Sequence, residues 1–144
     1  MTVPTIIAPG LSNSWRDSRY NRFQQRIVNK ALTCIDYGID KKSHHVSIIT
    51  ERNRIIAVAT NDEAKTDPRA GALGYYGAKQ HSEYRALKGI TWKSSYRFFN
   101  IRCDKSGNIT LAKPCRRCAT FLRKNGVSRV YYTDGDGFFE TLMM

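Results

Sequence analysis

Segments with the residue pattern of β-strands alternate along this chain with segments that have the spacing of amphipathic helices. The expected helices cover residues 14–34, 81–89 and 114–125, and the expected strands cover residues 44–50, 54–60, 96–103, 127–133 and 138–142. Only Asp-Gly-Asp-Gly separates the last two strands, which is too short for a crossover helix, so this pair is expected to be antiparallel. The sequence therefore predicts an α/β, three-layer fold with a five-stranded mixed sheet and helices on both faces.

The first helix and the long polar segment after the second strand complete this outline. Ser14 is a good N-cap, and apolar residues recur from Tyr20 to Cys34 at three- and four-residue spacing, so a helix is expected over this range. Residues 61–80 are polar and contain Pro68 and several glycines. We expect this segment to be a loop that arches over one end of the sheet.

Length and composition fit a single domain that covers residues 1–144. A chain of 144 residues with 41% hydrophobic content can bury one core and is too short for two. No apolar run approaches the ~20 residues of a membrane span, and the N-terminal stretch lacks the order of regions in a secretory signal. A cytoplasmic protein without a membrane partner is the expectation.

Charge and cysteine content narrow the classes of ligand. The 24 lysines and arginines exceed the 12 acidic residues, so the net charge of +12 favours polyanions such as nucleotides or nucleic acid. High charge is also compatible with solubility alone. In a reducing cytosol, a Cys-x-x-Cys pair is more often a metal or redox site than a disulfide.

Two short motifs have the residue types of a catalytic metal site. Pro114 suits the first turn of a helix, which places Cys115 and Cys118 on one face near the N-terminus, where the helix dipole favours thiolates. His81 is the nearest imidazole candidate at the start of another helix. Catalytic zinc has three protein ligands and one open position. The sequence therefore predicts a zinc ion bound by His81, Cys115 and Cys118, with water in the fourth place.

Glu83 lies two residues beyond His81 and is displaced around the helix from the metal position. A carboxylate there can reach metal-activated water and serve as a proton shuttle. Taken alone, His81 is more often an ordinary surface or core histidine, and Glu83 a solvated helix charge. Their joint placement with the Cys-x-x-Cys pair favours the functional interpretation.

The pair of motifs, His-Ser-Glu at 81–83 and Pro-Cys-Arg-Arg-Cys at 114–118, resembles the zinc-dependent cytidine/deoxycytidylate deaminase superfamily. The resemblance spans roughly residues 44–137. It implies that Glu83 is the catalytic proton shuttle and that hydroxide attacks C4 of cytosine with release of ammonia. It also implies that Asn61 lies at the sugar and base edge, and that the backbone at Ser82 and Lys113 meets the polar edge of the pyrimidine. Asn61 could instead be a simple turn residue.

Departures from the family pattern bear on the substrate. Many relatives have alanine where this chain has Ser82, and serine or glutamate where it has Lys113, so base specificity stays open. Relatives that act on nucleotides, tRNA or single-stranded DNA have histidine at the position of His81, which favours a phosphorylated substrate. The expected antiparallel last hairpin instead resembles the free-cytidine branch.

Two further functions stay open at this point. A deaminase of single-stranded DNA or RNA would use the basic surface and the aromatic residues Tyr75, Tyr76, Tyr131 and Tyr132 to hold a flipped base, although packing is the commoner role of such tyrosines. A non-catalytic zinc module that binds nucleic acid is the other, although a structural site usually has a fourth protein ligand. The apolar stretch at residues 138–144 also makes a homo-oligomer the expected assembly.

Overall fold

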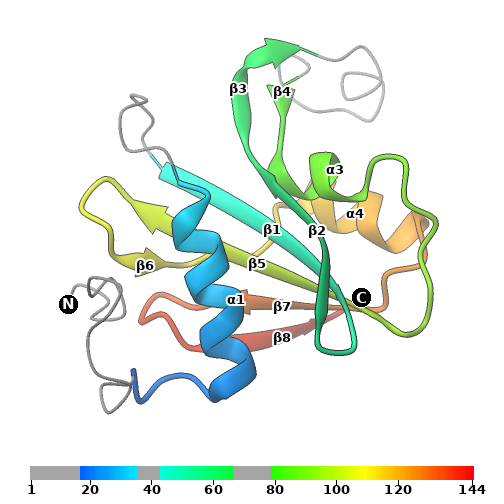
Figure 1. The fold of residues 1–144 in the computed structure, drawn as a ribbon. Helices are drawn as coiled ribbons and strands as arrows, with labels where there is room; N and C mark the ends of the chain where they lie inside the picture. Colours follow the sequence, from blue (N-terminus) through cyan, green and yellow to red (C-terminus); the bar gives the residue numbers. More distant parts are fainter. Residues whose placement is uncertain (1–16, 36–42, 67–78) are drawn as a thin grey trace.

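A mixed β-sheet forms the centre of the molecule (Figure 1). The computed structural model describes residues 17–35, 43–66 and 79–144. Within them the strand order is β2-β1-β5-β7-β8, and β6 pairs with the C-terminal end of β5. The strands are β1 (Ser43–Glu51), β2 (Arg54–Thr60), β5 (Tyr96–Asp104), β6 (Ile109–Thr110), β7 (Arg129–Thr133) and β8 (Phe139–Met143). β5 and β7 are parallel, and the other neighbouring pairs are antiparallel.

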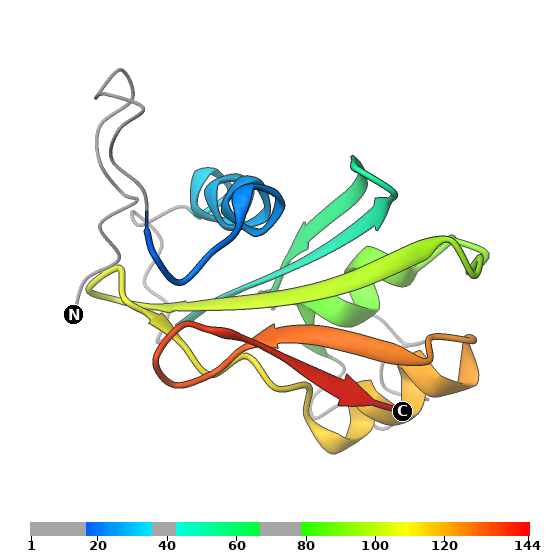
Figure 2. The same cartoon turned by 90° about the horizontal axis from the view of Figure 1, so that it is seen from below.

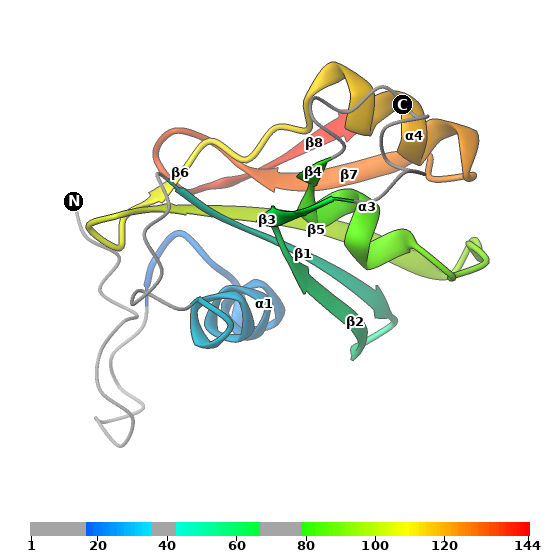
Figure 3. The ribbon, with the colours of Figure 1, turned by 90° about the horizontal axis from the view of Figure 1, so that it is seen from above.

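Helices cover both faces of this sheet. The described helices are α1 (Arg22–Thr33), α3 (Ser82–Leu87) and α4 (Arg116–Lys124). Figures 2 and 3 show α1 on one side of the sheet and α4 on the other. The expected mixed sheet with helices on both faces is therefore confirmed, as is the antiparallel pairing of the last two strands.

Side-chain alternation along the strands separates two apolar cores. On one face, α1 buries Ile27, Val28 and Ala31 against β1 and β5 residues such as Val46 and Ile101. On the other face, α3 and α4 pack against alternate positions of β1, β5 and β7. The buried residues of this second core are Ile49, Ala86, Leu87, Phe98, Leu122, Val127 and Val130. The sheet is thus buried on both sides, which is why its central strands read as nearly continuous apolar runs.

An aspartate side chain organises the turn of each of the two hairpins in the second half of the chain. Asp104 Oδ1 accepts hydrogen bonds from the backbone N–H groups of Ser106 and Asn108, both at 2.9 Å. Asp134 Oδ1 does the same for Asp136 at 2.8 Å and Phe138 at 3.0 Å. These side chains replace backbone partners in the turn, so each strand reverses directly into its neighbour.

The expected element boundaries need three corrections. Helix α1 begins after Asn21, whose side chain accepts from Gln24 N in a capping box, while Ser14 lies outside the described residues. Helix α4 begins one residue after its N-cap Cys115, so Pro114 precedes the helix instead of opening it. The expected loop contains β3 (Asp62–Thr66) and β4 (Lys79–Gln80), which form a separate two-stranded antiparallel sheet; residues 67–78 lie outside the described part.

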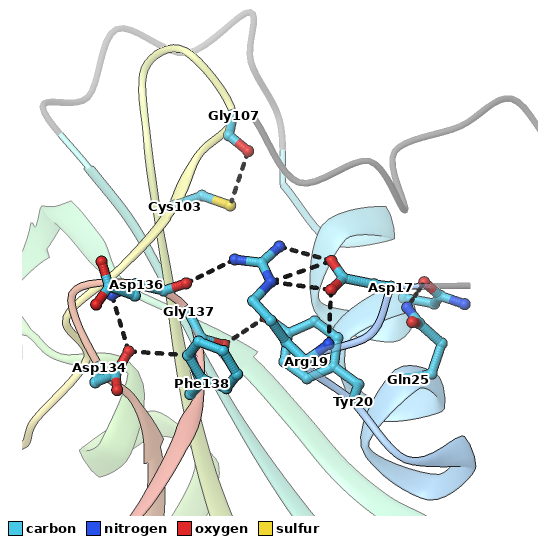
Figure 4. A network of polar contacts seen from close by, with 11 residues as sticks. Asp17, Arg19, Tyr20, Gln25, Cys103, Gly107, Asp134, Asp136, Gly137 and Phe138 are labelled. Carbon is cyan, nitrogen blue, oxygen red and sulfur yellow. Dashed lines mark hydrogen bonds and ion pairs between the residues drawn. The ribbon is translucent and has the colours of Figure 1, made fainter. Parts of the chain in front are cut away.

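A polar clasp joins the segment before α1 to the turn between β7 and β8 (Figure 4). The Arg19 guanidinium donates to both carboxylate oxygens of Asp17 and, through Nη1, to the carbonyl oxygen of Asp136 at 2.8 Å. Tyr20 Oη donates to the carbonyl oxygen of Gly137 at 2.6 Å. The Arg19 side chain is only 9% exposed, so this ion pair is shielded from water more than an ordinary surface pair.

None of the helices in the described residues has the length and apolar character that a membrane crossing requires.

We predict that Gly137→Ala destabilises the protein more than Gly89→Ala. Both glycines have positive φ angles, +88° and +79°, so alanine carries a backbone penalty of about 1 kcal/mol at either site. A Cβ at Gly137 would also collide with the Arg19 guanidinium, whereas a Cβ at Gly89 meets nothing within 4 Å. We expect a total loss of about 3 kcal/mol for Gly137→Ala, measured by denaturant unfolding. An equal decrease in the free energy of unfolding for the two variants would contradict the prediction that a side chain at position 137 disrupts the clasp.

Candidate metal centre

The candidate centre is built from residues at the N-caps of two helices. His81 is the N-cap of α3, and Cys115 is the N-cap of α4, each with extended backbone angles. Cys115 Sγ accepts a hydrogen bond from Cys118 N at 3.5 Å, so the sulfur itself caps the helix. Residues at N-caps lie where the positive ends of the helix dipoles meet anionic groups, which suits a thiolate.

The ligand atoms of three residues converge on one point. His81 Nδ1 lies 3.4 Å from Cys118 Sγ and 3.8 Å from Cys115 Sγ. All three ligand atoms lie within 4.8 Å of one another. Among the described residues this is the His/Cys/Asp/Glu group that could hold a metal ion. The predicted ligand residues are therefore brought together as expected.

Packing between α3 and α4 fixes this convergence. The rings of Tyr84 and Phe121 lie 5.4 Å apart, and Phe121 packs against the buried cluster of Tyr84 and Cys118. Arg85 Nη1 also donates to the carbonyl oxygen of Thr60 at 2.6 Å, which ties α3 to the end of β2. Side-chain contacts of both helices thus help to set the separation between His81 and the cysteines.

The electrostatics of the centre favour an ionised sulfur. A side-chain hydrogen bond from Cys118 is the largest cause that lowers the pKa of Cys115, to about 3, and His81 lowers it further against the opposing effect of burial. His45 lies near the same group on β1 and has its pKa lowered to about 4 by burial, with smaller effects of Arg102 and His81. At neutral pH, Cys115 is therefore a thiolate and His45 a neutral imidazole.

Glu83 is buried beside the centre, with 5% of its surface exposed. Its Oε2 accepts from Asn100 Nδ2 at 3.1 Å, and its Oε1 contacts Ser82 Oγ at 3.2 Å. Burial raises the pKa of this carboxyl group, and the nearby Cys115 adds to the increase. A carboxyl group with a raised pKa binds a proton more readily than a solvated one, which suits a residue that transfers protons.

The remaining predicted residues occupy different positions around the centre. Asn61 is buried, and its Oδ1 accepts from the backbone N–H of His45 at 3.1 Å. Ser82 is buried with its hydroxyl directed at Glu83 and Ser47. Lys113 is exposed, two residues before Cys115. Their expected contacts with a pyrimidine stay predictions.

Three residues near the centre were not predicted from the sequence. Ser47, Asn100 and His45 come from the central strands β1 and β5, far from either motif in the chain. Asn100 is 4% exposed and sits in the middle of an apolar strand, where asparagine is disfavoured. A polar residue within an apolar strand was the one sequence signal that could have pointed to Asn100 as a neighbour of the site.

A surface depression lies away from the centre. A hollow of about 640 Å³ is lined by residues at the β1–β2 turn and by Ser95. It lies at the end of β1 opposite His45, so it does not open onto the metal centre.

In comparisons with known proteins, no protein-family model and no curated protein matched the chain.

We predict that the purified protein contains about one metal ion per chain, as expected for a site with three protein ligands. The double variant Cys115→Ser/Cys118→Ser removes both sulfur ligands and should lose the metal, which elemental analysis would measure. Cys34→Ser is the matched control, because Cys34 lies at the C-cap of α1 and outside the group. Full metal retention in the double variant would rule out this centre.

Proposed function

We propose that this protein is a zinc-dependent hydrolytic deaminase that converts cytosine to uracil and releases ammonia. The observation that carries the proposal is the placement of a buried carboxyl group, Glu83, beside three converging His and Cys ligand atoms. Both parts open helices on the same face of the sheet. The two motifs that resemble the cytidine/deoxycytidylate deaminases supply exactly these residues, which links the resemblance to one location in the fold.

The donor set and its spacing fit zinc. Zinc–sulfur bonds of about 2.3 Å and zinc–nitrogen bonds of about 2.0 Å in a tetrahedron separate the nitrogen and sulfur by about 3.5 Å. The separations from His81 Nδ1 to the two sulfurs, 3.4 and 3.8 Å, lie on either side of that value. Thiolate and imidazole ligands favour zinc over magnesium or calcium. A site with three protein ligands also leaves a fourth position for water, which supports a catalytic over a purely structural ion.

In the proposed reaction, zinc activates the water and Glu83 transfers the protons. Zinc would supply a Lewis acid that activates water for attack on C4 of the cytosine ring. Glu83 takes a proton from that water, delivers it to ring N3, and then assists the transfer of a proton to the leaving amine. The products are uracil and ammonia, so water and cytosine balance the reaction. Ser82 and Asn100 hold the carboxyl group of Glu83 in place through both of its oxygens.

Basic residues around the centre support a phosphorylated substrate. Lys113, Arg116 and Arg117 are exposed beside Cys115, and the first turn of α4 contains no acidic residue. Cations at a helix N-terminus oppose the helix dipole, so a bound phosphate would relieve that repulsion. A nucleotide such as dCMP and a single-stranded nucleic acid share this chemistry, and we favour the nucleotide because His81 matches the nucleotide-acting relatives.

We predict that Glu83→Gln retains zinc and the fold but loses turnover by about 100-fold or more, because glutamine preserves the shape and cannot shuttle a proton. Ammonia release under substrate saturation measures the loss. The matched control is Glu140→Gln, which neutralises an exposed carboxylate on β8. Wild-type turnover by Glu83→Gln would exclude the proposed mechanism.

A panel of substrates tests whether the protein acts on a free nucleotide, a nucleic acid or an unphosphorylated nucleoside. Cytidine, CMP, dCMP, single-stranded DNA and RNA are assayed side by side at several salt concentrations, with adenine nucleotides included. We expect dCMP or CMP to be turned over best, with a gentle dependence on salt. Turnover of a polymer would fall steeply with salt because each phosphate contact releases counterions. Fast turnover of unphosphorylated cytidine alone would contradict the role given to the basic residues.

A further inference from the structure

A buried amide connects the two halves of the candidate centre. Asn100 lies on β5 directly opposite Ser47 of β1 in the strand register. Its Oδ1 accepts from Ser47 Oγ at 2.6 Å. Its Nδ2 carries two hydrogens and lies 3.1 Å from Glu83 Oε2 and 3.4 Å from the carbonyl oxygen of Ala112. The amide oxygen and both amide hydrogens therefore have a hydrogen-bond partner.

The two acceptors belong to the two separate segments that provide the metal ligands. Glu83 follows His81 in the first turn of α3. Ala112 precedes Cys115 by three residues, and its own N–H donates to the carbonyl oxygen of Thr133 on β7 at 2.8 Å. One side chain thus reaches from the middle of the sheet to the histidine segment on one side and to the cysteine segment on the other.

A closed ring of hydrogen bonds fixes the orientation of this amide. Ser47 Oγ lies 2.8 Å from Ser82 Oγ, and Ser82 Oγ lies 3.2 Å from Glu83 Oε1, which leads back to Asn100. The hydroxyl of Ser47 donates to Asn100 Oδ1, and the hydroxyl of Ser82 lies within hydrogen-bond distance of both Ser47 Oγ and Glu83 Oε1. The two serines therefore orient the amide of Asn100 and the carboxyl group of Glu83 together.

All four members of the ring are buried. Ser47, Ser82, Asn100 and Glu83 are between 0 and 5% exposed, so water does not compete for these partners. Hydrogen bonds in such surroundings are strong, and removing one partner leaves the others unsatisfied. Buried polar groups therefore hold Glu83 and Ala112 at a fixed separation more firmly than apolar packing would.

We propose that Asn100 is a positioning residue that sets the distance between the Glu83 carboxyl group and the Cys115–Cys118 turn, while Ser47 and Ser82 hold its amide in the required orientation. The effect on zinc binding depends only on the metal centre. The effect on turnover rests in addition on the proposed deaminase function.

Three variants test this role. Asn100→Leu keeps a side chain of similar shape but removes every hydrogen bond of the amide, and Ser47→Ala opens the ring while leaving Asn100 in place. Thr50→Val is the matched control, because Thr50 is a fully buried β1 residue whose hydroxyl has no hydrogen-bond partner among the described residues. Zinc affinity is measured by competition with a chromogenic chelator, and folding is checked by circular dichroism.

We expect Asn100→Leu to lower zinc affinity by about tenfold, as is typical for residues that support metal ligands, and Ser47→Ala to lower it less. In the deaminase assay, both should lower kcat, by about tenfold for Asn100→Leu, with KM unchanged, because they displace Glu83 without removing a substrate contact. Thr50→Val should match the wild type in both measurements.

Nuclear magnetic resonance of the Asn100 side-chain amide supplies a readout that needs no activity. We expect Ser47→Ala and Glu83→Ala to shift this pair of signals, and Glu83→Gln to leave it near its wild-type position because the glutamine carbonyl oxygen can still accept a hydrogen bond from Asn100 Nδ2. If Asn100→Leu does not fold, Ser47→Ala and the amide signals decide the question. If the wild type deaminates no substrate, the proposed function fails while zinc affinity and the amide signals still test Asn100.

The role of Asn100 is overturned if Ser47→Ala leaves the Asn100 signals in place. It is equally overturned if folded Asn100→Leu binds zinc as tightly as Thr50→Val does.

Discussion

The pairing of β1 with β5 is the constraint on which the rest of the structure depends. These strands are aligned over nine residue pairs, from Ser43 opposite Asp104 to Glu51 opposite Tyr96. Because side chains alternate between faces, this register places Ser47 and Asn100 together on the side of α3 and α4, and Val46 and Ile101 together on the side of α1. A slip of one residue would exchange the two faces and bury the polar row beneath α1.

Along the face that carries the centre, polarity changes in steps. The pair of Ile49 and Phe98 lies in the apolar core beneath the helices. Ser47 and Asn100 follow two residues along, and His45 opposite Arg102 comes next. The N-caps of α3 and α4 lie over the polar part, where Asn100 donates to Glu83 and accepts from Ser47. The bodies of the same helices rest on the apolar part, so binding groups and packing groups occupy separate rows of one surface.

Much of the fold could be predicted because its signals are local. Apolar runs and turn residues located five strands of the central sheet, and the short final turn required the antiparallel hairpin. The two-residue strands β4 and β6 were missed because so short a ladder has no periodicity to detect. The five-residue strand β3 was missed because its residues, Asp62–Thr66, are mostly polar and lack the apolar alternation of a strand. The start of α1 was placed too early because Tyr20 fits the helical stripe, although it reaches the same core from the segment before the helix.

The candidate site likewise contains residues that local motifs reveal and residues that only the folded sheet brings together. His81, Glu83, Cys115 and Cys118 stand out as motifs, whereas Ser47 and Asn100 act through a strand register that only the folded sheet creates. No local pattern links a serine at 47 with an asparagine 53 positions later. Sequence reasoning could therefore identify the groups that meet a metal, but not the groups that hold them.

The clasp around Arg19 also has a consequence for folding kinetics. Its hydrogen bond to the Asp136 carbonyl joins residues 117 positions apart. In the folded state this contact depends on the parallel pairing of β5 with β7 and on the last hairpin, which bring Asp136 beside the segment that precedes α1. Contacts that form after the transition state leave the folding rate nearly unchanged and slow unfolding instead. If the clasp forms late, as its large sequence separation favours, it lengthens the lifetime of the native state and has little influence on how quickly that state is reached.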